Sequence, residues 1–263
     1  MSVDLPWHLS VATERSHYSP SHYFIYKFGR VSGLTNVGFS ATDIYSNGIN
    51  TKVYPGHPTG APEQLGIFSA NDADDKDLTG MRTIRVHGLL TSDSEEETTE
   101  DVTLEGQVEQ FTTQSFYRCY RAYGLTYGSA STNVGVITVR HKTTTANVFA
   151  TIEAGIGQTL VGAFTIPRNV TGYLDGLNVT LTRASGAAGS AVVSLRVRDL
   201  GAGGYNVKRI YGVTTAIPLD ISHRYGITFA QQSDIKWTVE SVSDSGSNFT
   251  ADLNLVLIRT PNT

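Results

Sequence analysis

Alternation of apolar and polar residues recurs along most of this chain, and it constrains the fold more than any other feature. The clearest case places five apolar side chains on one face of a strand: Phe249, Ala251, Leu253, Leu255 and Leu257. Similar alternation runs through four other segments: 81–89, 116–124, 191–198 and 235–242. Successive side chains of a β-strand point to opposite faces, so this pattern predicts half-buried strands. No segment has the periodicity of a long helix.

Short strands separated by Gly-, Ser- and Asp-rich turns are typical of a β-sandwich or barrel. Only 17% of the residues are charged, compared with roughly 25% in an average globular protein. We therefore predict an all-β, antiparallel, jelly-roll-like fold, with two sandwiches in tandem as one option. The predicted seam is Gly155–Gln158, between a first sandwich at 31–155 and a second at 156–263.

The first thirty residues differ from the rest, because they are rich in aromatic side chains that follow no period. We predict an extended N-terminal arm at 1–30 that lies on a protein surface, either its own or that of a neighbour. Six aromatic residues of this arm are interface candidates: Trp7, Tyr18, Tyr23, Phe24, Tyr26 and Phe28. Tyr117 and Tyr120, which flank Arg118, are further candidates, since Tyr and Arg are enriched at binding hot spots. Ordinary cross-strand packing is the alternative for these two tyrosines.

The charge and the single cysteine exclude several classes of protein. A net charge of −4 gives no dominant basic face, so nucleic acid and anionic membranes are not expected partners. No apolar stretch approaches the roughly 20 residues that cross a bilayer. Met1–Asp4 lacks the start of a secretory signal, so synthesis in a cytoplasm is expected. Cys119 alone cannot form an internal disulfide, and its place in an alternating segment predicts a packed thiol.

Candidate catalytic and metal-binding residues are few. In the acidic segment 71–77, Asp72, Asp74 and Asp77 offer oxygen atoms at a spacing that a Ca²⁺ loop would need. The segment lacks the central Gly and the closing Glu of such a loop, and an ordinary exposed loop is the alternative. The sequence contains no nucleophile elbow, phosphate-binding loop or paired-His zinc motif. We therefore expect no enzymatic activity and no cofactor.

Several short motifs occur in a characteristic order: Tyr26-Lys27-Phe28-Gly29, Asp43-Ile44-Tyr45-Ser46-Asn47-Gly48, Ile67-Phe68-Ser69-Ala70-Asn71-Asp72, Gly80-Met81-Arg82-Thr83-Ile84-Arg85-Val86, Val102-Thr103-Leu104-Glu105-Gly106, Ser194-Leu195-Arg196-Val197-Arg198 and Ser233-Asp234-Ile235-Lys236. In this order they resemble virion structural proteins of tailed phages, often of aquatic bacteria. The resemblance covers roughly residues 24–258. The acidic stretch 73–80 departs from the Thr-, Ala- and Gly-rich segment of that family, so no role is carried over to it. The family offers no catalytic residues.

The resemblance implies a structural protein located in a virion and made in the host cytoplasm. The leading expectation is a capsid decoration (cement) or minor capsid protein, with the major capsid protein or neighbouring virion proteins as partners. Low charge and surplus aromatic residues also favour a homo-oligomer, with a trimer preferred. One alternative is a tail or fibre module that binds host carbohydrate through the Tyr-rich strand. A second alternative is a jelly-roll major capsid protein.

Overall fold

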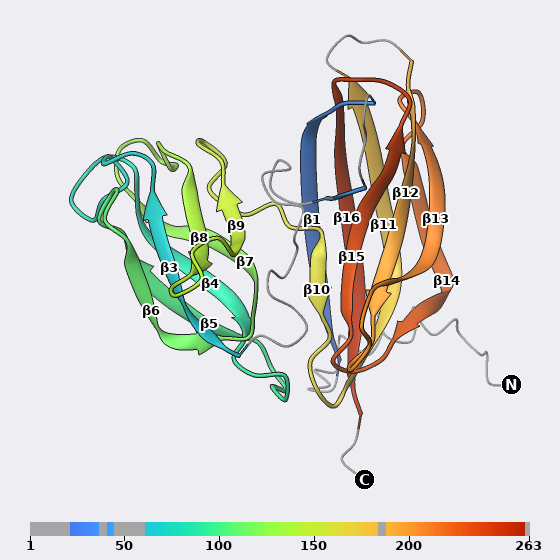
Figure 1. The fold of residues 1–263 in the computed structure, drawn as a ribbon, viewed down its shortest axis with the longest axis horizontal. Helices are drawn as coiled ribbons and strands as arrows, with labels where there is room; N and C mark the ends of the chain where they lie inside the picture. The colour runs from blue at the N-terminus through green and yellow to red at the C-terminus, as the bar shows by residue number, and fades with distance from the viewer. Residues whose placement is uncertain (1–21, 37–40, 45–60, 184–187, 261–263) are drawn as a thin grey trace, which may run out of the picture.

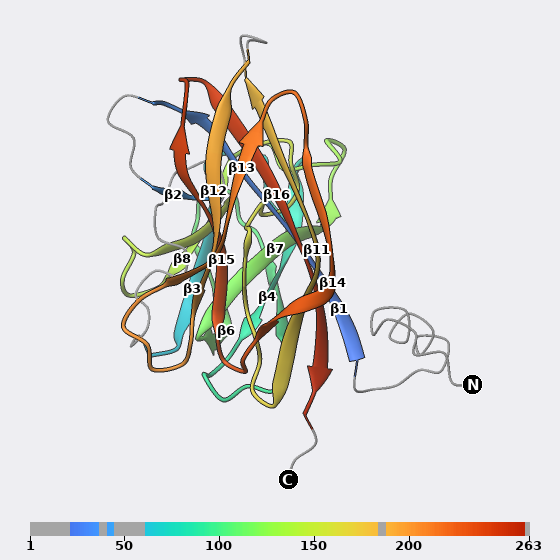
Figure 2. The same cartoon turned by 90° about the vertical axis from the view of Figure 1, so that its right-hand side faces the viewer.

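The computed structural model describes residues 22–36, 41–44, 61–183 and 188–260. Every regular element in these residues is a β-strand, and all paired strands run antiparallel. Figure 1 shows two lobes side by side, each built from facing sheets, and Figure 2 looks along the long axis with the lobe that holds the strands between residues 170 and 259 in front. The predicted all-β sandwich architecture is therefore confirmed. None of the described residues forms a helix that is long and apolar enough to cross a membrane.

The larger lobe consists of two sheets. The first sheet has four strands in the order β1 (His22–Leu34), β16 (Ser247–Arg259), β11 (Val170–Arg183) and β14 (Leu219–Phe229). The second sheet has β10 (Ala163–Thr165), β15 (Asp234–Val242), β12 (Ser190–Arg198) and β13 (Asn206–Thr214), and the short β2 (Thr42–Asp43) also pairs with β15. We call this lobe the main sandwich.

The smaller lobe also consists of two sheets. One sheet has β6 (Gln110–Phe116), β3 (Glu63–Ser69), β8 (Ile137–His141) and β9 (Val148–Ile152). The other has β5 (Thr98–Thr103), β4 (Met81–Leu89) and β7 (Arg118–Tyr127). We call this lobe the inserted sandwich, because the main sandwich supplies strands both before it and after it in the chain.

The position of β1 corrects the predicted N-terminal arm. Residues 22–30 belong to this strand, whose partner is β16 near the other end of the chain. The short strand β2 is also part of the main sandwich, so the predicted first domain at 31–155 began too early. The predicted seam near Gly155 falls between β9 and β10, which lie in different sheets.

The reason for this error is the composition of β1. Its inward positions include Lys27, Gly29 and Val31, which are buried, whereas Tyr26 and Phe28 face outward. Over this part of β1 a charged residue and a glycine face inward while aromatic residues face outward, which is the reverse of an ordinary amphipathic strand. A hydrophobic-period rule therefore misses it.

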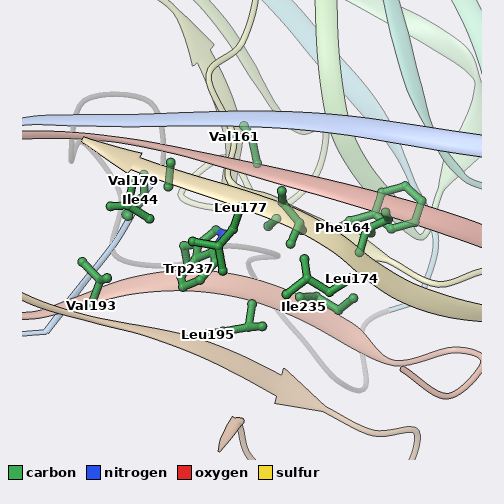
Figure 3. Close-up of a cluster of buried hydrophobic side chains, with 14 of the residues drawn as sticks. Ile44, Val161, Phe164, Leu174, Leu177, Val179, Val193, Leu195, Ile235 and Trp237 are labelled. Carbon is green, nitrogen blue, oxygen red and sulfur yellow. The ribbon is translucent and has the colours of Figure 1, made fainter. Parts of the chain in front are cut away.

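The main core lies between the two sheets of the main sandwich. The fully buried Trp237 of β15 is the largest side chain in this cluster. Figure 3 shows it among aliphatic side chains from strands of both sheets: Leu174, Leu177, Val179, Val193, Leu195 and Ile235. A second core fills the inserted sandwich. The main core also includes Leu89, Tyr120 and Ala150 of the inserted sandwich, so apolar packing continues from one lobe into the other.

One edge of the main sandwich, formed by β1 and β10, faces the inserted sandwich (Figure 1). Here the backbones approach closely: a Cβ atom on Gly29 would lie 2.5 Å from the backbone nitrogen of Gly162. Only a residue without a side chain fits this contact. Gly29 therefore allows β1 to lie directly against the segment that leads into β10.

Candidate functional site: the polar junction between the sandwiches

The junction between the two sandwiches contains a buried charged cluster in which one carboxylate binds two guanidinium groups. Asp234 begins β15, Arg198 ends β12, and Arg118 begins β7 of the inserted sandwich. All three side chains are almost completely buried. The strand ends meet at one end of the junction, which brings these residues together although they are far apart in sequence.

Asp234 accepts hydrogen bonds with both of its carboxylate oxygens. Nε and Nη2 of Arg118 lie 3.0 Å from Oδ1 and Oδ2 respectively. Nε of Arg198 lies 3.0 Å from Oδ2, and its Nη2 also donates to this oxygen. The hydroxyl of Thr165 donates to Oδ1 at 2.6 Å. Tyr117 adds a further contact, since its ring centroid lies 3.8 Å from the Arg118 guanidinium carbon.

The environment keeps Asp234 ionised. Burial raises the pKa of its carboxyl, but the charges and hydrogen bonds of Arg118 and Arg198 lower it by more, so the pKa lies below its ordinary value. A buried ion pair is stable only when its hydrogen-bonding capacity is satisfied. The bidentate Arg118 contact and the Thr165 hydroxyl meet this requirement, and the cluster fixes the position of β7 against the main sandwich.

A second charged group lies in the same junction, around Lys27 of β1. Its ammonium donates a hydrogen bond to the carbonyl of Tyr120 at 3.2 Å and lies 4.3 Å from the centroid of the Tyr120 ring. Burial lowers the pKa of Lys27 to about 8. Burial also raises the pKa of nearby Glu97, but His87 and Lys27 lower it by more, so Glu97 stays below its ordinary range. Lys27 thus places a cation from the main sandwich among groups of the inserted one.

Neutral backbone and side-chain contacts complete the junction. The amide of Arg168 donates to the carbonyl of Ser94 at 2.9 Å, and the side chain of Gln232 donates to the carbonyl of Ser92 at 2.7 Å. The β4–β5 connection therefore rests on two loops of the main sandwich. On the other side, the segment that follows β9 runs along β7, where the Thr159 amide donates to the carbonyl of Ala122 at 2.8 Å.

A cavity of about 680 Å³ lies beside the charged cluster. Its walls come from both sandwiches and include Tyr117, Arg118, Arg198, Asp199, Gln232 and the loop 200–203. Two guanidinium groups and two carboxylates line it, so the walls carry no excess of either charge. No group of three or more His, Cys, Asp or Glu side chains among the described residues is arranged to hold a metal ion.

Asp74, one of the candidate calcium ligands, has a different role in the structure. Its side chain is fully buried. Oδ1 accepts hydrogen bonds from the amides of Met81 at 2.9 Å and Val134 at 2.8 Å. Oδ2 accepts them from the Ser69 hydroxyl at 2.6 Å and the Gly135 amide at 2.7 Å. These donors occupy the positions that a cation would need, so Asp74 holds three loops together and is not available as a metal ligand.

The other acidic candidates, Asp72 and Asp77, are exposed. Asp72 lies near the amide of Gln107, at 3.4 Å. Asp77 donates its own amide to the carboxylate of Asp75 at 2.9 Å. The segment is thus an acidic loop that is anchored by Asp74.

The aromatic interface candidates fall into three groups. Trp7 and Tyr18 lie outside the described residues. The backbones of Tyr23 and Phe24 pair with β16, and Tyr26 and Phe28 are exposed on the same strand, with Tyr26 63% exposed.

Tyr117 and Tyr120 lie in the junction within one molecule, where Tyr117 is half-buried and Tyr120 is buried, so the packing alternative describes Tyr120. Tyr120 is only 1% exposed, and its ring packs at an angle against that of Phe164 of β10, with ring centroids 4.9 Å apart. The predicted packed thiol of Cys119 is confirmed, and burial raises its pKa to about 12.

Lys27, Arg198 and Asp234 were not identified from the sequence as parts of a site. Two members of the junction had a local signal in the sequence. Lys27 lies among aromatic residues that follow no period, and Arg118 lies among tyrosines. Nothing in the sequence indicates that Arg118 and Asp234, which are 116 positions apart, form a pair.

No protein-family model matches this chain, and no curated protein matches it. Two solved structures of infectious bursal disease virus show weak structural similarity. For the Gt strain the identity is 9% and the TM-score is 0.26, over 92% of this chain and 74% of that chain. For the Gx strain the identity is 12% and the TM-score is 0.28, over 92% and 73%. These scores are too low to carry an argument about fold or function.

We expect Lys27 to make the stability of the protein depend on pH in alkaline solution. Its pKa is about 8 in the folded state and 10.5 ordinarily. The buried charge therefore costs stability below about pH 8. This cost disappears as the pH rises from there toward 10.5, the ordinary pKa of lysine. The free energy of unfolding should rise by about 3 kcal/mol over this window, as measured by urea denaturation at several pH values.

The test variant is Lys27→Met, and its matched control is Lys208→Met. The first removes the buried ammonium and should abolish the rise, whereas the second removes an exposed one and should retain it. An equal rise in the Lys27→Met protein would show that another group is responsible.

Proposed function

We propose that this chain is a structural protein of a virus particle, most simply a capsid decoration (cement) or minor capsid protein of a tailed phage. The observation that carries the proposal is the junction: two β-sandwiches are joined by a buried, hydrogen-bonded charged cluster and by continuous apolar packing. Such a body suits a protein that must transmit load between neighbours without bending. The ordered sequence motifs, which resemble those of phage virion proteins, support the same role.

The geometry gives less support to a carbohydrate-binding fibre module. That alternative was motivated by the Tyr-rich strand near Tyr117 and Tyr120. Tyr120 is buried between the sandwiches and Tyr117 is covered by Arg118. The strand therefore offers no open row of aromatic rings on which a sugar could stack at these positions.

Cryo-electron microscopy of purified particles tests the proposal. We expect density for both lobes at repeated positions on the shell, in contact with major capsid subunits, and the chain in the protein content of the particles. Density confined to the tail tip would overturn the decoration role. Absence of the chain from purified particles would overturn the structural role altogether.

A further inference from the structure

Strand β13 lies at the edge of the second sheet of the main sandwich and has a free edge. It is bonded to β12 on one side, and among the described residues no strand pairs with its other side. Residues 206–210 are all exposed. Figure 1 shows β13 on the side of the main sandwich that is remote from the inserted one. An exposed strand edge in a soluble protein is a ready contact for another chain.

The β13 edge carries both apolar and basic side chains. Ile210 is 61% exposed, Val207 is 46% exposed, and Ile217 in the following turn is 71% exposed. Lys208 and Arg209 form no ion pair with any described residue, and residues 200–219 contain no Asp or Glu. Exposed apolar side chains beside unneutralised cations are typical of a surface that binds a partner with acidic and apolar groups.

The backbone of β13 argues against simple continuation of the sheet. Arg196 of β12 pairs with Val207, and the preceding Leu195 pairs with Arg209, so Lys208 is the extra residue of a bulge. A bulge that carries Lys is a common device that prevents edge-to-edge pairing of strands. We therefore expect contacts through side chains at this edge.

A surface that is acidic and apolar, and so complements the basic and apolar β13 edge, lies at the far end of the inserted sandwich. The loop 71–79 and the turn 105–108 are bonded together there, through the Gly106 amide and the carbonyl of Asp74 at 2.9 Å. Apart from the buried Asp74, the two segments hold four carboxylates and one lysine, Lys76, which is ion-paired with Glu105. Two apolar residues protrude from them: Val108 is 60% exposed and Leu78 is 47% exposed. We call this surface the acidic end.

We propose that the β13 edge of one molecule binds the acidic end of a second copy of this chain, head to tail. The two surfaces lie on opposite sides of the molecule along its long axis (Figure 1), so they cannot meet within one copy. Their charges are of opposite sign, and each has exposed apolar side chains that the other can cover. Contacts between two different surfaces of one chain produce rings or extended arrays.

This inference adds a partner and a surface to the proposed function. Its test uses the isolated chain, so it can fail even if the chain is found in a particle. Many weak head-to-tail contacts on a lattice would reinforce one another through high effective concentration.

Sedimentation of the purified protein tests the inference. We expect concentration-dependent association at low ionic strength that weakens at about 0.5 M salt, because exposed charges are screened there. Lys208→Glu with Arg209→Glu should abolish association, and so should Asp72→Lys with Asp77→Lys. Mixing these two reversed proteins should restore association, since each basic surface then meets an acidic one.

The control is Arg121→Glu with Arg168→Glu, which makes the same change of charge at two exposed positions elsewhere and should leave association unchanged. Circular dichroism checks that all variants are folded. A wild-type protein that stays monomeric at millimolar concentration and low salt would overturn the inference. Folded reversed proteins that still associate alone, or that fail to associate when mixed, would overturn it as well.

Discussion

Asp74→Asn is expected to destabilise the inserted sandwich severely, by about 4 kcal/mol. Each carboxylate oxygen of Asp74 accepts two hydrogen bonds, and three of the four donors are backbone amides. An asparagine of the same shape has one oxygen and one NH₂ group. Whichever way its amide is turned, the NH₂ group faces at least one buried backbone amide, Gly135 on one side or Met81 and Val134 on the other, and that amide loses its acceptor.

This prediction is checked by urea denaturation, with the fluorescence of the protein and circular dichroism as probes. Asp77→Asn is the matched control, because it makes the same chemical change in the same loop at an exposed position. It should alter the free energy of unfolding by no more than about 0.5 kcal/mol. Equal stability of the two variants would show that the hydrogen bonds of Asp74 contribute little.

Asp234→Asn is expected to weaken the junction by about 3–5 kcal/mol, because it leaves two guanidinium groups buried with no anion. The two sandwiches should then unfold in separate steps, so that two transitions replace one. The effect should appear only while Asp234 is ionised in the wild-type protein. Because the pKa of Asp234 is lowered on folding, its contribution is present above the ordinary Asp range near pH 4 and is lost as the pH falls below it.

Two comparisons make the result specific. Arg85→Ala with Asp101→Ala removes an ion pair that is also bidentate but solvent-exposed, and should cost no more than about 1 kcal/mol. Replacing the whole cluster with Arg118→Met, Arg198→Met and Asp234→Leu should restore much of the stability, since apolar residues of similar volume often substitute for a buried ion pair. A single unchanged transition in Asp234→Asn would mean that the apolar contacts alone join the sandwiches.

The strand content could be predicted because it depends on local pattern. The five inward residues of β16 from Phe249 to Leu257 are all buried, and Val256 is the one apolar, buried residue that interrupts their alternation. In the same way, the alternation in 235–242 predicts β15, and the buried Trp237 lies at its centre. One face of each of these strands packs against a core and is apolar, so the alternating residue types indicate which side chains are buried.

The sites could be predicted much less well. The acidic loop was visible as a cluster of oxygen atoms, but whether Asp74 would meet a cation or amide donors depended on Val134 and Gly135, some sixty positions away. For Tyr120 the sequence left a binding role and ordinary packing both open, because nothing local shows that β10 packs on it.

The sequence by itself determined the fold class and the approximate strands, since period two and turn composition are properties of neighbouring residues. Only the tertiary structure decided that β1 closes the main sandwich, that one sandwich is inserted into the other, and that Arg118, Arg198 and Asp234 share one buried site. The physical reason is that pairing between distant strands and the burial of charge depend on which surfaces meet. In β1, buried Lys27 and Gly29 serve the junction and conceal the very alternation by which a strand is recognised.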